Sequence, residues 1–229
     1  MKKIIKLVVL LVICSSIFFI YQKTKHNNYN IMNIGDELSI SINSYGIKEF
    51  SPAHYLKNEL TKTYKKVRTN NKYSASENTI KNMLETVKYN NEIKKELANS
   101  NIILLTLGYN DLIYKLNVNE DISESKFNKI MNSIEEDYNN LIYEIRKYSK
   151  RKIIVITYPD TNKDNYYLKK GIRYLNEILM KNEEIIYIDS YKLLANRDKY
   201  FSNPHSFYPN RYGYLEISKE IIIKTRDYY

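Results

Sequence analysis

The chain has 229 residues, which is enough for one domain of ordinary size or for one domain with an appendage. Hydrophobic residues make up 43% of it and there are only 5 Gly and 4 Pro, so composition excludes both a disordered chain and a low-complexity filament. A single Cys excludes a disulfide framework and a zinc site built from cysteines.

The formal net charge of +10 has to be located before it can be interpreted. Residues 1–25 contain lysines and no acidic residue, and they account for +5 of the +10. In the remaining chain, Lys and Arg are interleaved with Glu and Asp along stretches of helical periodicity, which is typical of solvated helix faces. We therefore predict no nucleic-acid partner, because no basic stripe is present.

Residues 1–28 are predicted to be a membrane anchor with a short linker. An uncharged and largely apolar run extends from Leu7 to Gln22, with lysines on both sides. Together with Ile4 and Ile5 the run approaches the roughly 20 residues that a membrane-spanning helix needs. The sequence before Lys23 has no small-x-small cleavage site, which favours an uncleaved signal anchor over a cleaved signal peptide.

The charges beside the apolar run also predict its orientation. Three lysines and the amino terminus precede the run and two lysines follow it, so the short N-terminus is expected to stay inside the cell. The folded part, residues 29–229, would then lie on the extracytoplasmic side of a single-pass cell-membrane protein. Lipidation of Cys14 is the less favoured alternative, because the bulky Ile13 precedes it.

The folded part alternates short apolar runs with long amphipathic stretches, which predicts alternating strands and helices. A repeating strand–helix order with right-handed crossovers gives a three-layer α/β/α sandwich around a five-stranded parallel sheet, of the flavodoxin-like kind. A ligand site in such a sheet lies outside the carboxyl ends of the strands. The predicted strands are residues 31–34, 64–69, 101–107, 152–157 and 184–189, and the predicted helices are residues 51–63, 77–98, 123–149, 166–181 and 211–226.

Three short motifs lie at predicted strand ends or before the last helix. They are IGDELS at 34–39, LGYND at 107–111 and YPNRYGY at 208–214. In this order and at these places they resemble the conserved blocks of the SGNH (GDSL-type) esterase and lipase family: Gly-Asp-Ser-Leu, Gly-x-Asn-Asp and Asp-x-x-His-Pro-Asn-x-x-Gly-Tyr. The resemblance covers nearly all of residues 31–229 and implies an SGNH-hydrolase-like fold.

The resemblance also implies which positions would carry the family's chemistry. Glu37 stands at the place of the nucleophilic Ser, Tyr208 at the place of the general-base His, and His205 at the place of the preceding Asp. Glu77 takes the place of the Gly in the second block, within Ser76-Glu77-Asn78-Thr79. Asn110 matches the Asn that binds the oxyanion in the family.

These departures predict a protein that has lost serine-esterase chemistry. Acyl transfer by serine needs a hydroxyl, an imidazole that takes its proton and a carboxylate that orients the imidazole. A tyrosine, with an ordinary pKa of about 10, is no base at neutral pH. An anionic Glu37 would also repel the oxyanion that Asn110 would otherwise stabilise. We therefore expect a binding or scaffolding domain without a cofactor, and the resemblance suggests acylated or glycosidic cell-envelope material as its ligand.

Two other arrangements of the same residues stay open. An active ester hydrolase could use a rearranged set of Ser39, Asn110 and His205, although Ser39 is more simply explained as an N-terminal cap after Gly35. Alternatively, Glu37 and His205 could face each other across the pocket. They could form a hydrogen-bonded pair or, together with Asp36, bind a metal ion. We favour the hydrogen-bonded pair and predict no metal. The predicted pocket comprises Asp36, Glu37, Ser39, Glu77, Asn110, His205 and Tyr208.

Overall fold

The computed structural model describes residues 13–16, 28–116, 122–160, 166–203 and 205–228. Apart from residues 13–16, which are helical, the predicted membrane anchor lies outside the described residues. Within the described ranges, no helix combines the length and the apolar character that crossing a membrane requires.

A five-stranded, fully parallel sheet forms the centre of the domain, as the sequence predicted. The strand order is β2-β1-β3-β4-β5, so the chain crosses from one side of β1 to the other between β2 and β3. The central strands are continuous apolar runs because helices cover both of their faces. The strands are β1 (Asn28–Gly35), β2 (Lys66–Ser74), β3 (Ile102–Thr106), β4 (Lys152–Ile156) and β5 (Ile185–Ile188).

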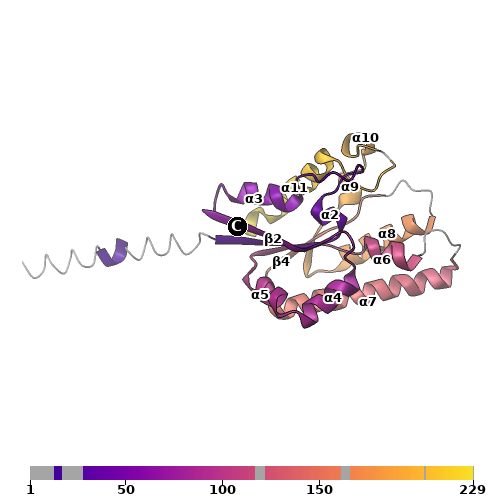
Figure 1. The fold of residues 1–229 in the computed structure, drawn as a ribbon, viewed down its shortest axis with the longest axis horizontal. Helices are drawn as coiled ribbons and strands as arrows, with labels where there is room; N and C mark the ends of the chain where they lie inside the picture. The colour runs from indigo at the N-terminus through magenta and orange to yellow at the C-terminus, as the bar shows by residue number, and fades with distance from the viewer. Residues whose placement is uncertain (1–12, 17–27, 117–121, 161–165, 204, 229) are drawn as a thin grey trace, which may run out of the picture.

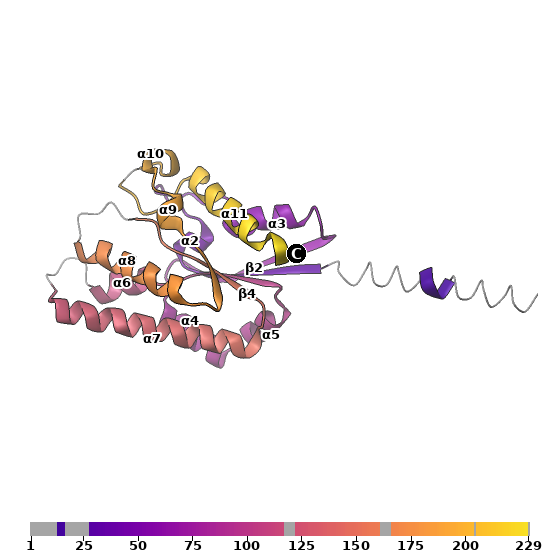
Figure 2. The same ribbon diagram turned by 180° about the vertical axis from the view of Figure 1, so that it is seen from behind.

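Helices cover the two faces of the sheet and complete the predicted three-layer sandwich (Figure 1, Figure 2). One face carries α3 (Pro52–Leu60) and α11 (Arg211–Thr225), with the short α2 (Glu37–Ile40), α9 (Ser190–Leu193) and α10 (Arg197–Tyr200) near the carboxyl ends of the strands. The other face carries α4 (Ile80–Tyr89), α5 (Asn91–Asn99), α6 (Tyr109–Leu116), α7 (Glu124–Tyr148) and α8 (Tyr166–Lys181). A short 3-10 helix, η1 (Arg226–Tyr228), follows α11.

Each face of the sheet has its own hydrophobic core. Alternate residues of β3 point to opposite sides, so Ile103 and Leu105 join the core under α4 to α8, whereas Ile102 and Leu104 join the core under α3 and α11. This alternation fixes the register of β3 between its neighbours, because a shift by one residue would exchange the two sets of side chains.

Three sequence predictions need correction. The single helix predicted for residues 77–98 is two helices, because Asn90 ends α4 and its side chain caps α5 by accepting hydrogen bonds from the N–H groups of Glu92 and Ile93. Strand β2 reaches Ser74, well beyond residue 69, because its polar and charged residues suit an exposed edge of the sheet. The segment after Gly108, for which no helix was predicted, forms helix α6.

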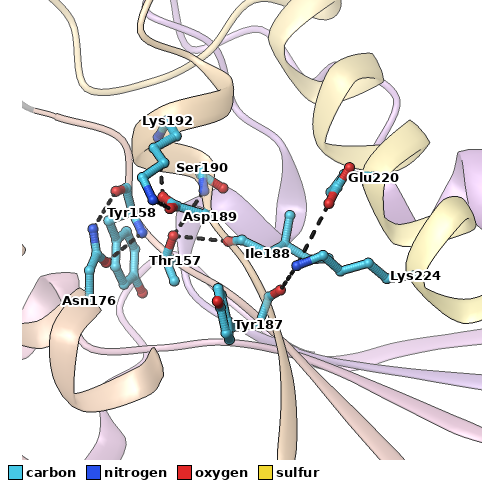
Figure 3. Close-up of polar contacts among 10 residues, drawn as sticks. All are labelled: Thr157, Tyr158, Asn176, Tyr187, Ile188, Asp189, Ser190, Lys192, Glu220 and Lys224. Carbon is cyan, nitrogen blue, oxygen red and sulfur yellow. Dashed lines mark hydrogen bonds and ion pairs between the residues drawn. The ribbon is translucent and has the colours of Figure 1, made fainter. Parts of the chain in front are cut away.

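Side-chain hydrogen bonds tie down the carboxyl ends of β4 and β5 (Figure 3). The Thr157 hydroxyl donates to the Ile188 carbonyl at 2.9 Å and accepts from the Ser190 N–H at 2.9 Å. The Asn176 amide, on α8, accepts from the Tyr158 N–H at 2.9 Å and donates to the Tyr158 carbonyl at 2.8 Å. The backbone of Tyr158 is therefore held from both sides just where β4 ends.

Candidate functional site

The turn after β1 begins with a glycine because nothing larger fits there. A Cβ on Gly35 would lie 2.4 Å from the Thr106 carbonyl oxygen and 2.7 Å from the Ser39 Cβ. The close approach lets the Asp36 N–H donate to that Thr106 carbonyl at 2.9 Å, which joins the ends of β1 and β3. The carboxyl ends of the two strands thus meet at the predicted place.

Asp36, not Ser39, caps helix α2. The Asp36 carboxylate accepts a hydrogen bond from the Leu38 N–H at 3.1 Å. Ser39 lies inside the helix, only 2% exposed, and its hydroxyl donates back to the Asp36 carbonyl at 2.6 Å. The prediction that Ser39 caps this helix is therefore wrong, because Asp36 already occupies the N-cap position.

The carboxyl group of Asp36 is buried against Tyr158. Its side chain is 1% exposed, and the Tyr158 hydroxyl donates to its Oδ2 at 2.5 Å. Burial raises the pKa of Asp36 to about 8, in spite of the hydrogen bonds from Tyr158 and Leu38 that lower it. At neutral pH this carboxyl group is therefore mostly protonated and contributes little negative charge to the site.

Glu37 is half-buried and lies against Asn110. Burial raises the pKa of the Glu37 carboxyl, a hydrogen bond from Asn110 opposes the change, and the charge of Glu77 adds to it. The Asn110 Nδ2 lies 3.4 Å from the Glu37 Oε2, 2.7 Å from the Ser76 carbonyl oxygen and 2.9 Å from the Asn78 carbonyl oxygen. Three acceptors thus surround two N–H hydrogens, so the amide is already saturated without any ligand.

The segment that carries Glu77 is held by backbone carbonyls and by an aspartate. Asn78 Nδ2 donates to the carbonyl oxygens of Gly35 at 2.9 Å and Tyr73 at 3.0 Å. Asp111, which follows Asn110, accepts from the Ile80 N–H at 2.9 Å and so caps the start of α4. Glu77 itself is exposed. Asp111, the acidic residue of LGYND, therefore has a structural role.

Aromatic rings build the wall of the site next to the last motif. Phe207 stacks on Tyr109 with ring centroids 3.7 Å apart, and it lies 5.7 Å from the ring centroid of Tyr158. Burial, with a smaller contribution from the charge of Glu37, raises the pKa of Tyr208 to about 12. The phenol of Tyr208 therefore keeps its proton at neutral pH.

His205 is placed differently from the other predicted site residues. It lies in an exposed turn, where its main-chain N–H donates to the Asn203 Oδ1 at 2.9 Å. The Glu37–His205 pair stays a prediction: His205 is exposed, and the described hydrogen bond of the Glu37 carboxylate is the one from Asn110.

Ser39 is not placed as a nucleophile in the described part of the chain. Ser39 is buried and its proton is directed at a backbone carbonyl, so neither His205 nor a substrate has access to it. Within the part of the chain that the structure describes, no group of three or more His, Cys, Asp or Glu side chains is gathered closely enough to hold a metal ion. Glu37 presents a half-buried carboxylate next to the amide of Asn110.

Solved structures with the same architecture decide the fold family. A lipase from a goat rumen metagenome matches with a TM-score of 0.70 and 17% identity, over 86% of this chain and 96% of that protein. An acetylxylan esterase from Geobacillus stearothermophilus matches with a TM-score of 0.60 and 15% identity, over 87% and 95%. A protein of the lipolytic G-D-S-L family from Veillonella parvula matches with a TM-score of 0.57 and 16% identity, over 85% and 97%.

The chain has an SGNH-hydrolase-like fold. No known protein-family model and no curated protein sequence matches it, so the likeness rests on structure. In this SGNH-hydrolase-like domain the turn after β1, the start of α6 and the loop before α11 meet around Glu37, Asn110 and Tyr208.

Sequence reasoning missed two residues that shape this site. Tyr158 holds Asp36 and lies two residues after the end of β4, so its place near a strand end was the signal that could have revealed it. Tyr109 precedes Asn110 in the LGYND motif, and it stacks on Phe207, which directly precedes the YPNRYGY motif in the sequence.

Proposed function

We propose that this protein is a membrane-anchored, extracytoplasmic SGNH-hydrolase-like protein that is inactive as a serine esterase and serves as a binding or scaffolding domain at the cell envelope. The observation that carries the proposal is the contact between Glu37 and Asn110. A carboxylate at the nucleophile position and a saturated amide at the oxyanion position oppose acyl transfer together.

The same contact suggests how the retained site would bind. Glu37 is half-buried and can accept hydrogen bonds from hydroxyl groups, and the ring of Tyr208 beside it offers an apolar surface. A sugar presents both hydroxyl groups and an apolar C–H face. We therefore assign acylated or glycosidic envelope material as the ligand class, and the match to an acetylxylan esterase agrees with this choice.

The inactivity can be tested directly on the purified full-length chain in detergent. With short p-nitrophenyl esters we expect hydrolysis at the rate of the buffer blank, and with a serine-directed fluorophosphonate we expect no labelling, because the described site presents no exposed, activated serine. The acetylxylan esterase from Geobacillus stearothermophilus is the positive control. Turnover or labelling that disappears in Ser39→Ala would contradict the proposal and support the rearranged hydrolase.

The proposed location has its own test. The proposal rests on the lysine distribution around Leu7 to Gln22, which predicts that the folded part lies outside the cell. Protease added to intact cells should then remove the domain detected by an antibody against its C-terminus, while a cytoplasmic marker protein survives. Protection of the domain until the cells are lysed would show that the orientation is wrong.

A further inference from the structure

A second hollow lies apart from the Glu37 site, at the start of α3. It has a volume of about 530 Å³ and is lined by the loop before α3, by α3 itself, by β2 and by the first residue of α11. This volume falls within the range of roughly 300–1,000 Å³ that small-molecule sites occupy. We call it the basic hollow, and its lining includes Lys48, Phe50, His54, Lys57, Thr69 and Arg211.

The basic hollow carries an excess of positive charge. Lys48, Lys57 and Arg211 line it, and among the described residues none of the three forms an ion pair. The one carboxylate in the lining, that of Glu49, accepts a hydrogen bond from Asn43 Nδ2 at 2.9 Å. Three cations from three elements outnumber this one carboxylate in the lining, and the excess of positive charge favours an anionic ligand.

Two further features of the lining add to this attraction. Helix α3 begins in the hollow with Ser51 as its N-cap, so the positive end of its dipole faces the same space. The Thr69 hydroxyl is buried, and the described part of the chain provides it with no hydrogen-bond partner. A buried hydroxyl without a partner is costly unless a ligand satisfies it.

The hollow also has an aromatic wall. Phe50 is 50% exposed and stacks on His54 with ring centroids 4.5 Å apart, and the Arg211 guanidinium lies 6.0 Å from the centre of the Phe50 ring. A bare inorganic anion would leave this wall uncovered and most of the volume empty. A ligand that joins an anionic group to a compact organic part would use both.

We propose that the basic hollow binds an organic phosphate, with the phosphate between Lys48, Lys57 and Arg211 and the organic part, such as a sugar ring, against Phe50. Phosphate is favoured over a single carboxylate because its higher charge and additional oxygens can engage three cations at once. The proposal does not depend on the Glu37 site, since none of the residues that line the hollow takes part in the Glu37–Asn110 contact.

The test uses thermal unfolding of the full-length chain in detergent, followed by circular dichroism in a phosphate-free buffer. Glucose 1-phosphate should raise the Tm in a concentration-dependent way, inorganic phosphate should raise it less, and glucose should leave it unchanged. The shift should shrink as salt concentration rises. No shift with either phosphate, or an equal shift with glucose or glucuronate, would overturn the proposal.

Substitutions in the lining test whether glucose 1-phosphate binds in the basic hollow. The double variant Lys57→Gln with Arg211→Gln should weaken the apparent affinity for glucose 1-phosphate at least tenfold. The control, Lys81→Gln with Lys129→Gln, removes the same charge from exposed positions on α4 and α7 and should bind like wild type. Phe50→Ala should weaken glucose 1-phosphate but not inorganic phosphate. Equal losses in the two double variants would show that net charge, not the basic hollow, is responsible.

Discussion

Gly35→Ala is expected to lower the free energy of unfolding by about 3 kcal/mol or more, at the severe end of overpacking in a tight core. The added methyl carbon would lie 2.4 Å from the Thr106 carbonyl oxygen, which is backbone and cannot swing aside. Relief requires β1 and β3 to separate at their ends, and this would break the hydrogen bond from the Asp36 N–H to Thr106. Urea unfolding followed by circular dichroism would measure the change.

Gly46→Ala is the matched control for that substitution. Gly46 has a φ of +75° and no atom within 4 Å of the added methyl, so only the backbone conformation opposes the change. We expect a cost of about 1 kcal/mol from the left-handed conformation. If both variants lose the same free energy, the steric argument at Gly35 is wrong.

The stability of the Asp36→Asn variant is expected to fall less than that of the wild type as the pH rises. The pKa of folded Asp36, about 8, lies above its ordinary value of 3.8, so the folded state holds the proton more tightly than the unfolded state does. Its contribution is fully present below about pH 3.8 and is lost as the pH approaches about 8. Asparagine mimics the protonated form and stays neutral, so its own contribution should not change over this window.

The effect should be large, because one pKa unit corresponds to about 1.4 kcal/mol of stability. Unfolding in urea at several pH values between 4 and 8 would measure this effect. Relative to wild type, the free energy of unfolding of Asp36→Asn should rise by a few kcal/mol between pH 4 and pH 8. Asp227→Asn, at an exposed position in η1, is the control and should follow the wild-type profile. Parallel profiles for Asp36→Asn and wild type would refute a buried, protonated Asp36.

The sheet was predictable because its strands are encoded locally. The runs around β3 and β4 are apolar throughout, and a parallel strand covered on both faces needs this pattern. The break between α4 and α5 was not predictable in the same way. The apolar spacing continues on both sides of Asn90, and an asparagine inside a helical pattern does not reveal that its side chain caps the next helix.

The candidate site was predictable only where strand ends determine it. Glu37 and Asn110 follow β1 and β3, which are neighbours in the sheet, so their contact follows from topology. The bond between Tyr158 and Asp36 joins residues separated by 122 positions, and no local pattern encodes it. The exposed position of His205 depends on the path of the loop before α11. That path could not be predicted, because the sequence of the loop has no hydrophobic periodicity.

The aromatic stack of Tyr109 on Phe207, with Tyr158 bonded to Asp36 beside it, has an evolutionary consequence. These residues hold three strand ends and the loop before α11 together, and Tyr208 adds an edge contact to Phe207 with ring centroids 5.6 Å apart. The side chain of Glu37 takes no part in these ring contacts. The residue beside Asn110 can therefore change during evolution at little cost to the packing that holds the strand ends together.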